Sequence, residues 1–389
     1  MRICVIYDCL YPHTVGGAER WYRDLVNELV AKGHEVTYVT RRQWDRGSGP
    51  TIPGVRVVGL EPSLPLYDRN GRRRITEAIA FGAGVFAHLL RHGRRYDVVH
   101  TASFPYFSLL AVGATRRMCG FDLAVDWHEI WTHDYWAEYL GGLSGRFGWL
   151  VQRLCLRPRQ HAYCFSQLHA ARLREYGVHG DVVVLTGQYA GTAGTPTLAA
   201  DPPTVVYIGR HLPEKGVADI VPAVAAARLR LPTLRAEIFG DGPDRARVEQ
   251  LVEDAGLRDV IAIRGFVDAD VLTASLARSL CLVLPSRREG FGKVVVEAAA
   301  AGVPSVVVAG ADNAAVELIE DGVNGFVAAS ASADDLAAAI VRVHNGGEQL
   351  RHATRAWFAT NAERLSLDVA VAQVVTRYAT GAPAVAPGA

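Results

Sequence analysis

Two segments in the second half of the chain carry charged side chains between glycines. In the first, residues 209–216 (GRHLPEKG), Arg210 and Lys215 follow a short β-branched run and therefore lie in a loop at the carboxyl end of a predicted strand. Two cations fixed in such a loop suit a diphosphate, because charge-assisted hydrogen bonds to phosphate oxygens are strong. Taken alone, the segment could also be a solvated loop with surface charges.

The second segment, residues 285–297 (PSRREGFGKVVVE), adds two carboxylates. A buried strand ends at Pro285, a glycine-rich turn follows, and a helix begins near Gly292. Glu289 lies in the turn and Glu297 inside the helix, so they could accept hydrogen bonds from the hydroxyls of a ribose and of a second sugar. The rest of the helix is Val and Ala, so a buried Glu297 would need polar partners, and the N–H groups of the first turn could hold phosphate.

The elements that must position these loops alternate between strand and helix. Residues 3–7, 18–32 and 35–40 read as strand, amphipathic helix and strand, with Gly33 ending the helix. Such alternation is typical of an α/β protein with parallel sheets. The other predicted strands are residues 55–58, 97–100, 123–127, 162–165 and 182–185 in the first half, and 205–208, 236–239, 261–263, 281–284, 305–308 and 326–327 in the second.

The length of 389 residues predicts two domains. We expect two doubly wound, Rossmann-like domains facing across a cleft, because ligands of such sheets bind beyond the carboxyl ends of the strands. A stretch rich in Gly, Thr, Ala and Pro separates them. The predicted parts are a first domain (1–190), a linker (191–203), a second domain (204–354), a C-terminal helix that packs back on the first domain (355–379) and a disordered tail (380–389).

Composition excludes several classes of function. The 41 basic and 40 acidic residues nearly cancel, so we expect no nucleic-acid partner. The six cysteines form no Cys-x-x-Cys pair, which favours reduced, buried thiols in a cytoplasmic protein. The N-terminal run MRICVIYD is too short for a signal peptide, and no stretch is long and apolar enough to span a bilayer.

Five ordered motifs lie between residues 209 and 304: Gly209-Arg210 with Lys215-Gly216, Phe239-Gly240-Asp241-Gly242-Pro243, Arg264-Gly265-Phe266-Val267, Glu289-Gly290-Phe291-Gly292 with Glu297-Ala298, and Gly302-Val303-Pro304. Together they resemble the C-terminal domain of glycosyltransferase family 4, whose members are retaining enzymes of the GT-B fold. The loop Gly16-Gly17-Ala18-Glu19 is similar to the family's first glycine loop. The resemblance implies transfer of a hexose-type sugar from a nucleoside-diphosphate sugar to an acceptor hydroxyl.

The resemblance also implies roles for single residues. Arg210 and Lys215 would bind the donor diphosphate and stabilise it as it leaves, Glu297 would bind the ribose, and Glu289 the donor sugar. His128 matches the family's active-site histidine beside the reacting sugar; by itself, a histidine after a strand is more often structural. The remaining donor contacts implied are Gly16 and Gly17 at the diphosphate, the segment Gly265, Phe266 and Val267 at the base, and the backbone of Phe291, Gly292 and Lys293 at the sugar and phosphate.

Aromatic residues cluster beside His128, in residues 127–139 (WHEIWTHDYWAEY). Aromatic faces stack on sugar rings, so this segment is our predicted acceptor site; a tightly packed helix is the alternative. The acceptor could be a glycan, a lipid-linked molecule or a natural product. The predicted acceptor contacts are Trp127, Trp131, Tyr135 and Trp136.

Arginines flank the apolar helix predicted at residues 75–90. They could rest on an anionic membrane surface, which would place the protein at the inner face of the membrane, or they could form a solvated basic face. The oligomeric state is left open. The arginines are Arg69, Arg72, Arg73 and Arg74 before the helix and Arg91, Arg94 and Arg95 after it.

The sequence predicts no metal site and no cofactor besides the donor. Asp268 and Asp270 have the spacing of a metal-dependent sugar-nucleotide site but open a predicted helix, and His128 and His133 are five residues apart, which favours different helix faces. A UDP-sugar is the first expectation for the donor, with GDP- and dTDP-sugars as alternatives. A GT-B phosphorylase, a nucleotide-sugar epimerase and a non-catalytic sugar-binding protein remain competing hypotheses.

Overall fold

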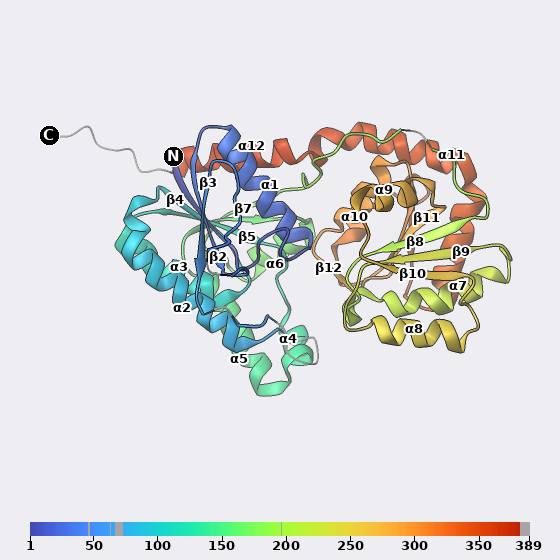
Figure 1. The fold of residues 1–389 in the computed structure, drawn as a ribbon, viewed down its shortest axis with the longest axis horizontal. Helices are drawn as coiled ribbons and strands as arrows, with labels where there is room; N and C mark the ends of the chain where they lie inside the picture. The colour runs from blue at the N-terminus through green and yellow to red at the C-terminus, as the bar shows by residue number, and fades with distance from the viewer. Residues whose placement is uncertain (46, 63, 67–72, 196, 382–389) are drawn as a thin grey trace. The chain divides into compact units, whose positions relative to one another are not determined.

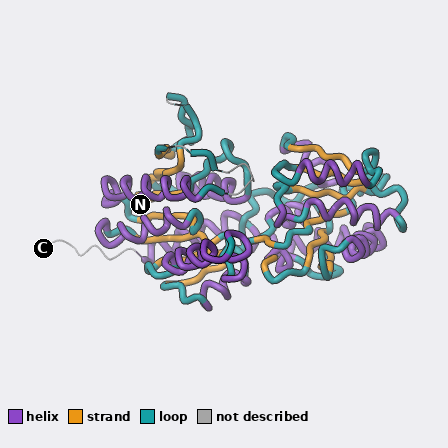
Figure 2. Tube along the Cα trace, turned by 90° about the horizontal axis from the view of Figure 1, so that it is seen from below, coloured by secondary structure: helices purple, strands orange, loops and turns teal. Residues whose placement is uncertain are grey.

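The computed structural model describes residues 1–45, 47–62, 64–66, 73–195 and 197–381. The chain forms two compact units: Met1–Ala190 together with Ser366–Ala389, and Gly191–Leu365. Each unit is a parallel sheet with helices packed on both faces (Figures 1 and 2). The predicted α/β class with two Rossmann-like domains is therefore confirmed.

The sheet of the first unit has the order β3-β2-β1-β4-β5-β6-β7, and all of its strand pairs are parallel. Every strand predicted in the first half of the sequence is present. The strands are β1 (Arg2–Ile6), β2 (Glu35–Arg41), β3 (Val55–Leu60), β4 (Val98–Ala102), β5 (Asp122–Trp127), β6 (Gln160–Cys164) and β7 (Gly180–Val184).

Helices cover both faces of this sheet. One face packs on α2, α3 and α5 through a hydrophobic cluster that includes Val99, Val125 and Trp127, and the other carries α1 and α12 (Figure 1). Side chains alternate along a strand, so neighbours in sequence belong to different faces. The helices are α1 (Gly17–Ala31), α2 (Ile75–His92), α3 (Tyr106–Cys119), α4 (His133–Leu140), α5 (Gly142–Cys155), α6 (Gln167–Glu175) and α12 (Leu367–Gly381), with a short 3₁₀ turn, η1 (Gly93–Arg95).

The sheet of the second unit has the order β10-β9-β8-β11-β13-β15, again parallel. All six predicted strands are present. They are β8 (Thr204–Ile208), β9 (Arg235–Phe239), β10 (Ile261–Gly265), β11 (Cys281–Leu284), β13 (Ser305–Val308) and β15 (Gly325–Ala328). The helices are α7 (Ile220–Arg228), α8 (Arg245–Asp254), α9 (Ala269–Arg278), α10 (Lys293–Ala300) and α11 (Ala333–Leu365), with 3₁₀ turns η2 (Pro213–Lys215), η3 (Val217–Asp219) and η4 (Ala314–Leu318).

Two short strands were not predicted. β12 (Arg288–Glu289) pairs in parallel with β14 (Asp312–Asn313) in a separate two-stranded sheet. Strands of two residues carry no detectable period, so the sequence pattern could not reveal them. They matter because β12 carries Glu289.

The C-terminal helical region differs from the single helix expected over residues 355–379. It is helical from Ala333 to Leu365, with a kink at Gly347, and is interrupted at Ser366 before α12 begins. Ser366 forms a β-bridge with Tyr189, and Leu367 N donates to Tyr189 O at 3.0 Å, so the backbone leaves helical geometry there. The tail expected from residue 380 lies outside the described residues from 382 onward.

Candidate active site

The loop after β8 carries Arg210 and Lys215 as predicted. Arg210 is exposed, and its carbonyl accepts a hydrogen bond of 2.9 Å from the buried Tyr207 hydroxyl. The loop closes at Gly216, which has φ +65°, and a Cβ there would lie 2.4 Å from the carbonyl oxygen of Pro285. Glycine is therefore required where this loop packs on the turn after β11.

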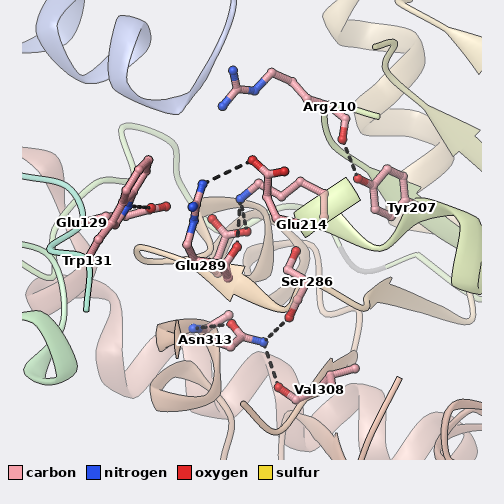
Figure 3. A network of polar contacts seen from close by, with 12 residues as sticks. Glu129, Trp131, Tyr207, Arg210, Glu214, Ser286, Glu289, Val308 and Asn313 are labelled. Atoms are coloured by element: carbon pink, nitrogen blue, oxygen red, sulfur yellow. Dashed lines mark hydrogen bonds and ion pairs between the residues drawn. The ribbon is translucent and has the colours of Figure 1, made fainter. Parts of the chain in front are cut away.

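Lys215 and Glu289 form an ion pair between these two loops (Figure 3). Lys215 Nζ donates to Glu289 Oε2 at 2.8 Å and to the carbonyl of Arg288 at 3.3 Å, and the two side chains are only 16% and 18% exposed. Arg288 Nη2 in turn lies 3.2 Å from Glu214 Oε1. The backbone carbonyl of Glu214 accepts a hydrogen bond from Arg287 N. Two ion pairs, Lys215–Glu289 and Arg288–Glu214, thus join the loop after β8 to the turn after β11.

Asn313 holds the turn after β11 in place, a role that the sequence does not predict. Its Nδ2 donates to the carbonyls of Ser286 and Val308 at 2.9 and 2.8 Å, and its Oδ1 accepts from Ala315 N at 3.1 Å (Figure 3). Because the side chain is buried and uses all of these partners, replacing it would leave backbone groups unsatisfied. No local pattern marks Asn313, which follows Asp312 in the sequence.

The other predicted donor residues of the second unit lie at the end of β10 or just after it, and just before or inside α10. Gly292 has φ +93° and takes the N-cap position of α10, directly before Lys293 at the start of the helix. Glu297 is half-buried rather than fully buried. Gly265 ends β10 with φ +68°, and the Phe266 ring beyond it is 68% exposed. The exposed ring is able to stack on a planar group.

Phe291 and Val267 complete the predicted set without strong features of their own. Phe291 is buried before α10, and Val267 is half-buried after β10. Asp268 takes the N-cap position of α9, although its side chain makes no hydrogen bond to the helix. Among the described residues, no group of three or more His, Cys, Asp and Glu side chains could hold a metal ion.

His128 follows β5 in the first unit and is held between aromatic rings. Its ring stacks on Phe165 with centroids 4.8 Å apart and planes at 9°, and meets Tyr22 edge-on at 5.9 Å. Its Nε2 is buried and has no hydrogen-bond partner among the described residues. Burial lowers the pKa of His128, opposed by the charges of Asp126 and Glu129, so the ring is neutral at pH 7.

Two of the four predicted acceptor contacts are wrong. Trp127 is 0% exposed and its indole donates to Gln160 at 2.9 Å, while Trp136 is buried and donates to Gln152 at 3.1 Å. The alternation along β5 explains the first error, because it directs Trp127 into the core on the face opposite His128. Neither ring has a face free for a ligand.

Trp131 and Tyr135 remain candidates for acceptor contact. Both are half-buried, and their rings meet edge-on at 4.8 Å. The Trp131 indole donates to Glu129 Oε2 at 2.9 Å, which fixes the ring and leaves a carboxylate beside it (Figure 3). A fixed aromatic ring next to a carboxylate is a common arrangement for a polyhydroxylated ligand.

The predicted glycine loop begins α1. Gly16 caps the helix in an extended conformation, and a Cβ there would lie 2.3 Å from Glu19 Oε2. At Gly17, no atom from the described part of the chain lies within 4 Å of such a Cβ. The Glu19 side chain could move away from such a Cβ, so this contact alone does not require glycine at Gly16, and the space beside Gly17 could admit a ligand.

Two family models match successive parts of the chain. The model described as "Glycosyl transferase 4-like domain" matches residues 16–188, and the one described as "Glycosyl transferases group 1" matches residues 195–359. Together they cover most of the sequence, including every candidate site residue. The chain belongs to the family 4 glycosyltransferases. The predicted resemblance is thereby confirmed.

This family 4 chain is similar to several characterised relatives over part of their length. It is 36% identical to an alpha-D-kanosaminyltransferase of Streptomyces kanamyceticus over 37% of this chain and 36% of that protein. It is 34% identical to a GDP-mannose-dependent phosphatidylinositol monomannoside mannosyltransferase of Mycobacterium tuberculosis over 36% of this chain and 38% of that protein. These matches span little more than a third of each relative.

Solved structures support the same fold over nearly the whole chain. Sucrose-phosphate synthase from Thermosynechococcus elongatus matches with a TM-score of 0.78 at 21% identity, covering 97% of this chain and 98% of that one. Anabaena HepE in complex with UDP-glucose matches with a TM-score of 0.73 at 17% identity, covering 98% and 100%. At this identity the likeness establishes the fold alone.

Proposed function

We propose that this chain is a retaining glycosyltransferase that moves a hexose-type sugar from a nucleoside-diphosphate sugar to an acceptor hydroxyl. One observation carries the proposal: a lysine and a glutamate lie 2.8 Å apart where the two loops meet at the carboxyl end of the second sheet. The cation suits phosphate and the carboxylate suits sugar hydroxyls. Family membership supports the same assignment.

The proposed donor site divides the work between charge and hydrogen bonding. Arg210 and Lys215 bind the diphosphate and neutralise the charge that grows as it leaves. Glu289 accepts hydrogen bonds from the sugar and Glu297 from the ribose. The backbone of Phe291, Gly292 and Lys293 borders sugar and phosphate, and Gly265, Phe266 and Val267 border the base.

No enzyme nucleophile is proposed. We infer substitution on one face of the sugar through an oxocarbenium-like transition state, with the leaving phosphate accepting the proton of the acceptor hydroxyl. His128 then acts beside the reacting sugar as a neutral ring, able to accept or donate a hydrogen bond. Gly17 gives a ligand room to approach the start of α1.

The donor and acceptor are proposed by class. A UDP-sugar is the first choice for the donor, and the GDP-mannose dependence of one relative keeps GDP-sugars in the comparison. Glycan, lipid-linked and natural-product acceptors are all kept in the comparison, and the name of the phosphatidylinositol monomannoside mannosyltransferase gives a lipid-linked acceptor. Trp131 and Tyr135 are the proposed acceptor contacts.

Acceptor-dependent release of nucleoside diphosphate tests the proposal. A thermal-shift screen of UDP-, GDP-, ADP- and dTDP-sugars first selects the donor, because a ligand that binds the folded state raises its melting temperature. We expect diphosphate release only when acceptor is added, and a product that NMR shows to keep the anomeric configuration. Inversion would refute retention, release driven by inorganic phosphate would indicate a phosphorylase, and donor isomerisation without acceptor would indicate an epimerase.

We also propose that α2 brings the protein to an anionic membrane surface from the cytoplasmic side. Ile75, Ile79, Phe86 and Leu90 are exposed at intervals of four, seven and four residues, which is one stripe of a helix. Exposed arginines follow at Arg91, Arg94 and Arg95; of the arginines predicted before the helix, Arg69 and Arg72 lie outside the described residues. No helix in the described parts of the chain is long and apolar enough to span a bilayer.

Vesicle sedimentation tests the membrane proposal. Phe86→Glu should lower binding to vesicles of phosphatidylcholine with phosphatidylglycerol by about tenfold or more, because burying a large apolar side chain contributes roughly 1.5–3 kcal/mol. Leu229→Glu is the matched control, since Leu229 is 87% exposed in the second unit. Equal losses in both variants, or equal binding to pure phosphatidylcholine vesicles, would contradict the assignment of this surface.

A further inference from the structure

Three polar residues, two on neighbouring strands and one directly after the second strand, point to the same face of the first sheet. His100 on β4 is the register partner of Ala124 on β5, and Asp126 and His128 follow Ala124 at intervals of two. Parallel partners project to the same side, and so do residues two apart along a strand. The side chains of His100, Asp126 and His128 therefore share the face that carries α1 and α12.

A buried polar network crosses this face. The Trp21 indole of α1 donates to Asp126 Oδ2 at 2.7 Å, and His100 Nε2 lies 2.8 Å from Asp126 Oδ1. On its other side, His100 Nδ1 is hydrogen-bonded to the hydroxyl of Tyr378 on α12. All four side chains are buried.

The network extends to the aromatic rings around His128. Trp21, which donates to Asp126, meets Phe165 edge-on at 5.2 Å, and Phe165 stacks on His128. Tyr22, the next residue of α1, is edge-on to both His100 and His128 at 6.2 and 5.9 Å. The rings that hold His128 are thus themselves held by groups bonded to Asp126 or packed on His100.

Asp126 gives the network a fixed charge. Burial raises the pKa of the Asp126 carboxyl. The nearby His100 ring and the hydrogen bonds that Asp126 accepts outweigh burial and lower this pKa below its ordinary value, so the carboxylate is ionised. A buried charge is stable only with its partners in place, which favours one arrangement of the surrounding side chains. Tyr378 of α12 is the hydrogen-bond partner of His100, from which it is 278 residues away in sequence.

We propose that Tyr378 and His100 are positioning residues for His128: α12 holds His100 against Asp126, and Asp126 holds the rings that orient His128. The proposal rests on the proposed function, in which His128 acts beside the reacting sugar. It also gives α12 a role in the activity of the first unit beyond completing its fold.

Tyr378→Phe tests the proposal with little change in shape, because it removes only the hydroxyl. We expect kcat for glycosyl transfer to fall about tenfold while the donor Kd stays unchanged, as for a group that acts on turnover alone. The NMR titration of His128, assigned by its absence in His128→Ala, should also shift. Tyr163→Phe is the matched control, since Tyr163 is buried on the same face and donates weakly, at 3.5 Å, to Val374 of the same helix.

Two further measurements keep the outcome decisive. His100→Gln should reproduce the loss of kcat, because it removes the ring that links Tyr378 to Asp126. A wild-type kcat and an unchanged His128 titration in Tyr378→Phe would overturn the proposal, and so would a lower melting temperature without either change. If the wild-type protein transfers no sugar, the proposed function fails instead, while the His128 titration still tests the coupling.

Discussion

Lys215→Met should raise the Kd for the nucleoside-diphosphate sugar by about 10- to 100-fold, since a hydrogen bond to a charged group contributes roughly 1.5–3 kcal/mol. Lys215 Nζ is only partly exposed and already lies against Glu289 Oε2 at 2.8 Å, so the loop holds the ammonium in place before the donor arrives. Turnover should fall as well, by about 100-fold or more, because a cation that neutralises a leaving group acts mainly in the transition state. Isothermal titration calorimetry with the donor, and initial rates at saturating donor, measure the two effects separately.

The controls for Lys215 separate phosphate binding from loss of the ion pair. The chain has only three lysines, and Lys32→Met makes the same change at an exposed site in the first unit, where donor affinity should stay unchanged. The double variant Lys215→Met/Glu289→Gln removes the carboxylate charge that the single change leaves unpaired. If donor affinity returned to the wild-type value in this double variant, the loss in Lys215→Met would come from the unpaired glutamate, and the phosphate role of Lys215 would be wrong.

Donor binding requires Lys215 and Glu289 to exchange their ion pair for contacts with the donor. In the structure described, Glu289 uses Oε2 to neutralise Lys215, whereas the proposed function needs the lysine on phosphate and the glutamate on sugar. A diphosphate carries more negative charge than one carboxylate, so it competes well for the ammonium. Glu289 is then free to accept hydroxyl hydrogen bonds without carrying an unpaired charge in a dry site, because the donor hydroxyls replace the lysine as its partner.

Sequence patterns predicted the fold because they report local physics. Strands at residues 3–7 and 205–208 were visible as β-branched runs between amphipathic helices, and the parallel sheets follow from that alternation. Glycines with positive φ, such as Gly216 and Gly292, marked the loops because no other residue adopts that backbone freely. The donor side of the site was accessible to sequence reasoning for the same reason: its residues are close in sequence to those signals.

The remaining parts of the site depend on contacts that no local pattern encodes. Asn313 supports Ser286 from 27 residues away, and Tyr378 reaches His100 across most of the chain. Composition alone assigns the aromatic residues beside His128 to the acceptor, whereas the alternation of side chains along β5 directs Trp127 to the opposite face, where it is buried. Composition indicates which residues can stack on a sugar, and only packing decides which of them have a free face.

His128→Ala should leave the donor Kd unchanged and lower kcat by about 100-fold or more, the usual effect of removing a group that exchanges a hydrogen bond or proton with the reacting atoms. The location of His128 explains why kcat should fall while the donor Kd stays unchanged. His128 lies in the first unit between Tyr22 and Phe165, whereas Arg210, Lys215 and Glu289 belong to the second unit. His133→Ala is the matched control, because it removes an exposed imidazole five residues further along, and its kcat should stay at the wild-type value.

The pH dependence gives His128 a second, independent test. Burial lowers its pKa, so the ring stays neutral as the pH falls through 6.5, where an ordinary histidine takes up its proton. If transfer needs the neutral ring, the wild-type rate should persist through pH 6.5 and fall only at more acidic values, and the residual rate of His128→Ala should lack that acidic limb. A wild-type kcat in His128→Ala would remove the histidine from the mechanism. An acidic limb that survives in the variant would assign the titration to another group, because the protonation that slows the enzyme must disappear with the ring that takes up the proton.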